Sequence, residues 1–211
     1  MKPLAECKLY TFIDTTYLRD RPPEAVAQQL CDGGADLIQL RAKGLRAEAI
    51  RRMAENILPV VHQHKIGLVI NDHLDVAQQV GADLCHLGQE DFFGAGFTQV
   101  SQLSTCGSQG RIGLSTHTPA QAERAMAAGP DYIAVGPVFA TPTKPAAKPV
   151  TLEFVRWAAN NVKIPWFAIG GINLENLGEV LDAGARRICV VSAILNAKDV
   201  AKTCAEFRRR L

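Results

Sequence analysis

Four similar heptapeptides decide how this chain folds, and their leading glycines are 47, 48 and 55 residues apart. They are Gly34-Ala35-Asp36-Leu37-Ile38-Gln39-Leu40, Gly81-Ala82-Asp83-Leu84-Cys85-His86-Leu87, Gly129-Pro130-Asp131-Tyr132-Ile133-Ala134-Val135 and Gly184-Ala185-Arg186-Arg187-Ile188-Cys189-Val190. Each glycine follows a helix-like pattern and precedes a short apolar run. This arrangement predicts that a helix ends and a strand begins at each repeat.

Four further apolar runs alternate with these repeats, at Leu9–Ile13, Gly67–Ile70, Ile112–Leu114 and Trp166–Ile169. The two sets together give eight strands about 25 residues apart, which is the period of βα units. Continuously apolar strands that alternate with helices indicate a parallel sheet covered on its outer face. We therefore predict a single (β/α)8 TIM barrel domain over residues 1–211. A doubly wound open sheet is the alternative, but the repeat has no break where its switch point would fall.

The composition indicates a self-sufficient globular protein. The chain has 211 residues, is 47% apolar and has a formal net charge of +2, which argues against a basic nucleic-acid-binding face. No apolar stretch reaches the length of a membrane span, and Lys2, Glu6 and Asp14 interrupt any signal peptide, so we expect a cytoplasmic location. The six cysteines form no C-x-x-C pair, so we expect buried free thiols rather than zinc ligands.

Polar residues at the predicted strand ends indicate the site, because a barrel carries its chemistry at the carboxyl ends of its strands. Gln39, Arg41 and Lys43 alternate along one strand end and therefore share one side, which suits a polyanion. Solvent-exposed surface cations are the simpler alternative. After the sixth strand, Thr141, Thr143 and Lys144 offer two hydroxyls and an ammonium for phosphate oxygens.

Two aspartates at neighbouring strand ends predict a metal site. Asp72 follows Asn71 after the third strand, and Asp91 follows the fourth. Close carboxylates repel one another unless a cation lies between them, and Mg²⁺ commonly takes one or two carboxylates with water and phosphate. Asp72 could instead cap the next helix, or serve both purposes. The five histidines share no metal-ligand spacing.

The remaining strand ends predict a second anion site and no protein nucleophile. Ser115 closes the fifth strand as a ligand candidate, Thr118 and Pro119 look like the start of a helix, and His117 is an acid–base candidate or a structural residue. Gly170, Gly171 and Ser192 end the last strands, where barrels commonly bind phosphate. No serine or cysteine is paired by the sequence with a histidine and an orienting acid. Two anion sites suggest two substrates, with diphosphate as a leaving group.

Seven motifs in this order resemble thiamine-phosphate synthases, over about Leu9 to Ile194. They are Ile38-Gln39-Leu40-Arg41-Ala42-Lys43, Ile70-Asn71-Asp72, His86-Leu87-Gly88-Gln89-Glu90-Asp91, Gly113-Leu114-Ser115-Thr116-His117-Thr118, the run from Val135 to Lys144, Ala168-Ile169-Gly170-Gly171-Ile172 and Val190-Val191-Ser192-Ala193-Ile194. The resemblance implies a barrel that joins 4-amino-2-methyl-5-(diphosphooxymethyl)pyrimidine to a thiazole phosphate, also in its carboxylated form. Diphosphate leaves first, and the thiazole nitrogen then attacks the pyrimidine cation.

The resemblance also implies the roles of individual residues. Mg²⁺ is held by Asp72 and Asp91. The pyrimidine diphosphate is bound by Gln39, Arg41, Lys43, Asn71, Ser115 and Lys144, of which Arg41, Lys43, Ser115 and Lys144 are the catalytic set. The thiazole phosphate is bound by Thr141, Thr143, Gly171, Val191 and Ser192.

Two segments depart from the family's pattern. Many relatives have a glycine near Val150 or Thr151, and the stretch from Phe92 to Gly110 is unfamiliar. Two alternative functions remain open at this point. One is a thiazole tautomerase that uses His117, although such relatives lack much of the diphosphate set present here. The other is a non-catalytic protein that binds thiazole phosphate. The sequence does not indicate the oligomeric state.

Overall fold

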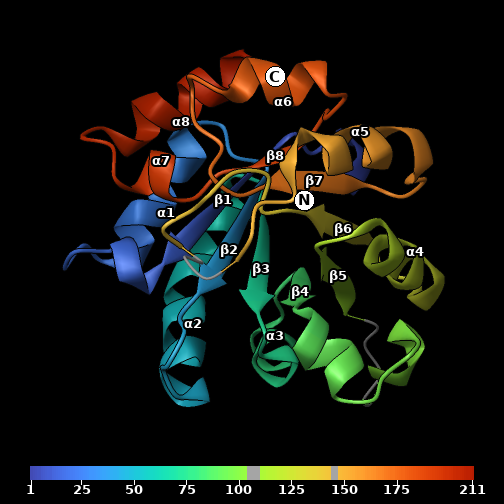
Figure 1. The fold of residues 1–211 in the computed structure, drawn as a ribbon. Helices are drawn as coiled ribbons and strands as arrows, with labels where there is room; N and C mark the ends of the chain where they lie inside the picture. Colours follow the sequence, from blue (N-terminus) through green and yellow to red (C-terminus); the bar gives the residue numbers. More distant parts are fainter. Residues whose placement is uncertain (104–109, 144–146) are drawn as a thin grey trace.

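The computed structural model describes residues 1–103, 110–143 and 147–211 and contains a closed barrel of eight parallel strands in chain order (Figure 1). The strands are β1 (Leu9–Asp14), β2 (Leu37–Arg41), β3 (Gly67–Asn71), β4 (Leu84–Leu87), β5 (Arg111–Thr116), β6 (Tyr132–Val135), β7 (Trp166–Ile169) and β8 (Ile188–Cys189). The barrel closes where β1 pairs with β8, with Leu9 opposite Ile188 and Tyr10 opposite Cys189. The predicted (β/α)8 barrel is confirmed, and the open-sheet alternative is excluded.

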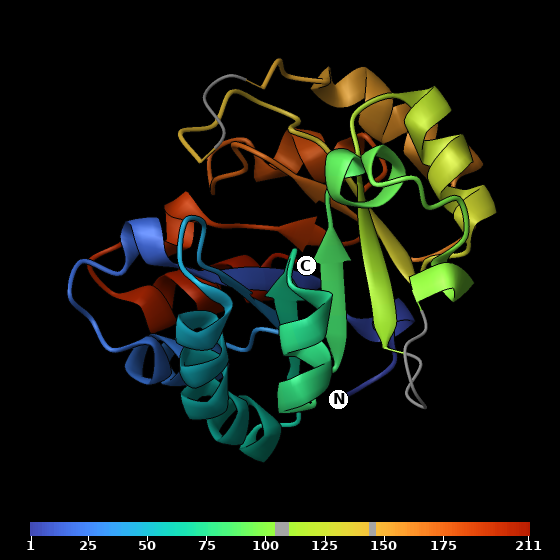
Figure 2. The ribbon, with the colours of Figure 1, turned by 90° about the horizontal axis from the view of Figure 1, so that it is seen from below.

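Helices follow most strands and surround the barrel, as the view from below shows (Figure 2). They are α1 (Pro23–Asp32), α2 (Ala47–Gln63), α3 (Leu74–Val80), α4 (Pro119–Ala128), α5 (Thr151–Asn161), α6 (Leu177–Asp182), α7 (Ser192–Leu195) and α8 (Val200–Arg209). Short 3-10 turns lie at Leu4–Glu6, Thr15–Tyr17 and Val100–Leu103. No helix in the described ranges combines the length and the apolar character needed to cross a bilayer.

The connection after β4 differs from the regular pattern. A π-helical turn over Glu90–Gly94 replaces the α-helix that follows other strands, within the described part of this connection. Phe92 anchors the turn, because its ring is fully buried and packs against Phe93 and Phe97 at centroid distances of 4.8 and 5.8 Å. This aromatic cluster anchors the segment that follows Asp91 to the core.

The repeated heptapeptides are helix-to-strand junctions, as predicted. Gly34, Gly81, Gly129 and Gly184 all have positive φ, between +70° and +100°, which a glycine adopts without the strain that a side chain would add. The aspartate two residues later has a second function that the repeat alone does not reveal.

Each repeated aspartate caps the start of the strand next to its own. Asp36 accepts hydrogen bonds from the amides of Lys8 and Leu9 before and in β1. Asp83 accepts from the amide of Leu68 in β3, and Asp131 accepts from the amide of Ile112 in β5. The fourth repeat has Arg186 at this position. The first three repeats therefore fasten odd-numbered strands to the strands that follow them.

The described cysteines are free and buried, as expected: Cys7, Cys31, Cys85, Cys189 and Cys204. Burial raises the pKa of the Cys7 thiol to about 11 and that of Cys31 and Cys204 to about 12. Cys106 lies outside the described residues. These thiols serve as small apolar side chains in the packing.

Candidate functional site

One pocket opens at the carboxyl ends of the strands, and all eight strands contribute to its lining. The strand residues that face it are Tyr10 and Phe12 of β1, Gln39 and Arg41 of β2, Asn71 of β3, His86 of β4, Ser115 of β5, Ala134 of β6, Ile169 of β7 and Cys189 of β8. Twelve residues of the predicted site line this pocket. They are Gln39, Arg41, Lys43, Asn71, Asp72, Asp91, Ser115, Thr141, Thr143, Gly171, Val191 and Ser192. Lys144 lies outside the described residues.

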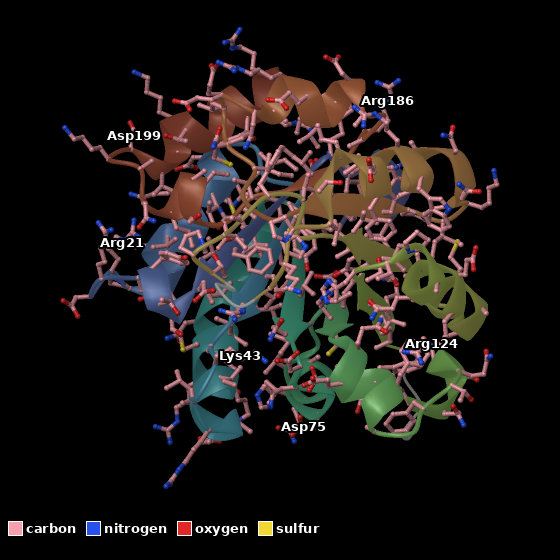
Figure 3. All side chains as sticks on the ribbon, viewed as in Figure 1. Arg21, Lys43, Asp75, Arg124, Arg186 and Asp199 are labelled. Carbon is pink, nitrogen blue, oxygen red and sulfur yellow. The ribbon has the colours of Figure 1, made fainter. Side chains whose placement is uncertain are left out.

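Two cations lie on the β2 side of the pocket. The Arg41 guanidinium donates from Nη1 to Asp14 Oδ2 at 2.7 Å, and the Asp14 side chain is completely buried. Lys43, which follows β2 and is labelled in Figure 3, forms an ion pair with Asp72. Sequence reasoning missed Asp14, whose only signal is a carboxylate that ends an apolar strand. The ion pair with Asp14 fixes the direction of the Arg41 side chain. The Lys43 side chain is more exposed, and its ammonium contacts the Asp72 carboxylate after β3.

The two aspartates predicted to bind metal both face the pocket. Asp72 has a φ of +63°, a conformation that Asp adopts more readily than most residues, and it accepts a hydrogen bond from Asn71 Nδ2 at 2.7 Å. Asp91 lies in the π-helical turn and accepts from the Gly88 amide at 3.3 Å. The proposed capping role of Asp72 is wrong: His73 stands at the N-cap of α3, without a side-chain hydrogen bond.

This pair of carboxylates fits Mg²⁺ better than a transition metal. Within residues 1–103, 110–143 and 147–211, no three His, Cys, Asp or Glu side chains gather to form a metal cage. Mg²⁺ needs no such cage, because one or two carboxylates, water and substrate phosphate complete its octahedron. The hard oxygen donors of Asp72 and Asp91 match that preference.

A serine and a histidine lie within hydrogen-bond distance in the site, a pair that the sequence did not predict. His86 Nε2 lies 2.9 Å from Ser115 Oγ, and His86 Nδ1 lies 2.9 Å from the Tyr132 hydroxyl. A phenol thus occupies the place that an orienting carboxylate takes in a nucleophilic triad. The pairing escaped notice because His86 and Ser115 are on neighbouring strands, 29 residues apart in sequence.

The opposite side of the pocket is neutral. Gly170 and Gly171 after β7 have φ values of +103° and +66°, and a Cβ on Gly171 would lie 2.6 Å from the carbonyl oxygen of Ala140. Thr143 accepts or donates a hydrogen bond with the Tyr17 hydroxyl at 3.0 Å, which joins the segment after β6 to the turn after β1. This wall presents hydroxyl groups and exposed backbone. Among the described residues that line the pocket, none on this wall has a charged side chain.

His117 also lines the pocket but is held by structural contacts. Its Nδ1 lies against the carbonyl oxygen of Gly136, and its amide donates to Gln121 Oε1 at 2.8 Å. Thr118 caps α4 by accepting from the Gln121 amide, and Pro119 begins the helix, as predicted. These contacts favour the structural interpretation of His117 over the acid–base one.

The fold and the pocket together define a (β/α)8-barrel protein whose strand ends hold a charged wall and a neutral wall suited to phosphorylated small molecules. Residues 9–194 match the family model described as thiamine monophosphate synthase. The thiamine-phosphate synthase of Thermus thermophilus is 43% identical over 91% of this chain and 88% of its own length. That of Acidothermus cellulolyticus is 41% identical over 99% and 96% of the two chains.

A solved structure extends the match to three dimensions. Thiamine phosphate pyrophosphorylase from Pyrococcus furiosus superposes with a TM-score of 0.86 at 30% identity, covering 99% of this chain and 96% of the other. A 3-hexulose-6-phosphate synthase, at 19% identity and a TM-score of 0.64, shares the fold alone. The chain therefore belongs to the thiamine-phosphate synthase family of transferases.

Proposed function

We propose that this pocket condenses the pyrimidine diphosphate with the thiazole phosphate to give thiamine phosphate and diphosphate; the carboxylated form of the thiazole phosphate would also lose its carboxyl group as CO2. The observation that carries the proposal is the division of one pocket into two walls. On one side, Arg41 ends β2, Lys43 follows it, and Asp72 and Asp91 follow β3 and β4. On the other side, Gly171 and Ser192 follow β7 and β8. In a closed barrel, β3 and β7 lie on opposite sides, so two anionic groups can bind without contact between their charges.

The charged wall would hold the pyrimidine diphosphate. Arg41 and Lys43 would bind its phosphate oxygens, and Asp72 and Asp91 would hold the Mg²⁺ that neutralises charge on the diphosphate. Gln39, Asn71 and Ser115 would orient the aminopyrimidine and the bridging oxygen. Lys144 is proposed as a further diphosphate ligand, from the sequence resemblance alone.

The neutral wall would hold the thiazole phosphate through the hydroxyls of Thr141, Thr143 and Ser192 and the backbone at Gly171 and Val191. A Cβ at position 171 would meet Ala140 and Phe139, so glycine lets the segment that leads to Thr141 pack directly against the Gly171 backbone. A neutral site suits this substrate, because its phosphate must be held without competing for the metal.

The reaction would then follow a dissociative course. The carbon–oxygen bond breaks, and its electron pair leaves with the diphosphate, whose growing charge Arg41 and Lys43 stabilise. The thiazole nitrogen then donates its lone pair to the pyrimidine methylene carbon, which forms the new carbon–nitrogen bond. No protein nucleophile takes part in these two steps, so the Ser115–His86 pair has a role other than covalent catalysis.

A coupled assay tests the proposal. The purified protein is given both substrates with and without Mg²⁺, and thiamine phosphate and diphosphate are measured. We expect equal amounts of both products, formed only when both substrates and Mg²⁺ are present. Conversion of the thiazole alone would establish a tautomerase instead. Binding of either phosphate without turnover would establish a non-catalytic binding protein.

A further inference from the structure

A continuous hydrogen-bond chain crosses the barrel interior and connects β2 with β5, and four of its five residues line the pocket. Gln39 Nε2 donates to the Tyr10 hydroxyl at 2.5 Å, and the Tyr10 and Tyr132 hydroxyls lie 2.9 Å apart. The Tyr132 hydroxyl then meets His86 Nδ1, and His86 Nε2 meets Ser115 Oγ, each at 2.9 Å. Both ends of the chain are residues that the proposed function assigns to the pyrimidine diphosphate.

The chain is buried and closely packed. Gln39, Tyr10, Tyr132 and His86 have exposed fractions of 2, 1, 0 and 8%. The His86 and Tyr132 rings stack at 5.6 Å, and a Cβ on Gly113 would overlap the Tyr132 ring. Glycine at position 113 therefore leaves the space in which the Tyr132 hydroxyl can reach His86. A buried polar group that loses its partner is costly, so these groups must stay paired.

A phenol can accept two hydrogen bonds but donates one, so the order of this chain follows from giving each buried hydroxyl hydrogen an acceptor. Because the Gln39 amide nitrogen only donates, the Tyr10 hydroxyl accepts from it, and the acceptor that the described residues offer for the Tyr10 hydrogen is the Tyr132 hydroxyl. The Tyr132 hydroxyl then gives its hydrogen to His86 Nδ1, which must be unprotonated. Burial raises the pKa of both tyrosines well above the ordinary value, so both phenols keep the hydrogens that this order needs.

We propose that this chain fixes His86 as the Nε2–H tautomer, so that His86 donates to Ser115 Oγ and the Ser115 hydroxyl hydrogen points to the bound substrate. The inference rests on the proposed function for the identity of that substrate. His86 and Tyr132 are positioning residues in this account, because they act through Ser115. In the reverse order, Ser115 would donate to His86 and could only accept from a ligand, whereas the ring nitrogens of a pyrimidine and the oxygens of a diphosphate are acceptors.

The tautomer can be measured without substrate. Protein labelled with ¹⁵N-histidine gives separate signals for protonated and unprotonated ring nitrogens, and the signal lost in His86→Gln identifies His86. We expect an unprotonated Nδ1 and a protonated Nε2 in the wild-type protein. Tyr132→Phe should change this signal more than Tyr10→Phe, because Tyr10→Phe leaves the Tyr132 donor in place. A protonated Nδ1 in the wild-type protein would overturn the proposal.

Kinetics then separate positioning from a general structural effect. Loss of one neutral hydrogen bond weakens binding about fivefold. Tyr132→Phe should therefore raise the KM for the pyrimidine diphosphate about fivefold and leave the KM for the thiazole phosphate unchanged. His86→Gln, whose amide can still donate to Ser115, should lose less activity than His86→Leu. The control is His62→Gln, on α2 and paired with Asp83 at the opposite end of the barrel, which should change neither value.

Other outcomes are equally informative. Equal rises in both KM values, or equal losses in His86→Gln and His86→Leu, would overturn the positioning role. A protein that shows the expected tautomer but makes no thiamine phosphate would refute the proposed function. It would still support the donor order that we propose for the hydrogen bonds from Gln39 to Ser115. The two failures are therefore distinguishable.

Discussion

The Arg41 guanidinium is held by the Asp14 carboxylate at 2.7 Å, and that carboxylate is completely buried beside the pocket. The pair lies across the β1–β2 ladder, where Asp14 is opposite Arg41 in register. A long flexible side chain is thus fixed before the substrate arrives, which lowers the entropy lost on binding. Arg41 keeps further donors on its planar fork, so one guanidinium can contact both Asp14 and a phosphate.

Asp14→Asn tests this relationship. The amide keeps an oxygen to accept from the Thr16 amide, as Asp14 Oδ1 does at 2.9 Å, but it removes the charge that holds Arg41. Charged hydrogen bonds contribute about 1.5–3 kcal/mol, so we expect the KM for the pyrimidine diphosphate to rise at least about tenfold. The control Asp32→Asn, exposed on α1, should be indistinguishable from wild type. A matching rise in the thiazole phosphate KM would contradict a role confined to Arg41.

Metal dependence distinguishes the two pocket aspartates from their neighbours. Asp72→Asn retains a residue that tolerates a φ of +63° and removes only the charge. We expect the Mg²⁺ concentration at half-maximal rate to rise at least about tenfold. Replacing a residue that only supports a metal ligand already lowers metal affinity by about that factor. Asp91→Asn should behave likewise. Asp75→Asn, labelled in Figure 3 at the exposed first turn of α3, is the control. An unchanged Mg²⁺ requirement in Asp72→Asn would refute the metal assignment.

The barrel was predictable because it depends on local periodicity, and half of the pocket lining was predictable from the ends of the expected strands and from the resemblance to a family. Alternation along β2 correctly placed Gln39, Arg41 and Lys43 on one side, and all three line the pocket. The partners of these residues were not predictable in the same way. Asp14 contacts Arg41 across 27 positions, and Tyr10 contacts Tyr132 across 122. Such pairs are determined by strand register and barrel closure, which a single sequence does not specify.

The errors also have a physical cause. Asp72 was interpreted as a possible helix cap because Asp is common there, yet its left-handed backbone turns the carboxylate to Lys43 and Asn71. The π-helical turn at Glu90–Gly94 leaves no periodic pattern long enough to recognise. Both departures lie at the pocket, where local preference yields to the geometry of the site.

Asp36 should contribute more stability than the other repeated aspartates. Its buried carboxylate accepts from the amides of Lys8 and Leu9, and it pairs with Lys2 and Arg208, which ties α8 to the start of β1. Loss of one partner of a buried ion pair costs about 3–5 kcal/mol, so Asp36→Asn should lower the Tm by about 10 °C. Asp131→Asn, which affects one amide hydrogen bond in β5, should have a smaller effect. Equal Tm losses in the two variants would contradict this ranking.

The buried thiols predict how stability changes at alkaline pH. Burial raises the pKa of Cys31 and Cys204 to about 12 in the folded protein, whereas a free thiol has a pKa of about 8.5. The folded state therefore holds more protons between these values, and stability falls as pH rises through that interval. We expect the urea midpoint to decrease steadily above about pH 9. The double variant Cys31→Ala, Cys204→Ala should show a shallower decrease, and an unchanged slope would show that other groups cause it.

Thr151, at the start of α5, has a strained backbone. Its φ is +64°, a left-handed conformation that costs a side chain about 1–2 kcal/mol, and branching at Cβ adds to the crowding. Glycine adopts it freely but loses about 0.5–1 kcal/mol through its more flexible unfolded state. Thr151→Gly should therefore stabilise the protein by roughly 0.5–1 kcal/mol and raise the Tm by about 2–3 °C. Thr151→Ala loses the same long hydrogen bond from the Glu153 amide as Thr151→Gly but keeps the Cβ that crowds the left-handed backbone, so it should not raise the Tm. Equal stabilisation by Ala and Gly would show that the backbone conformation is not the cause.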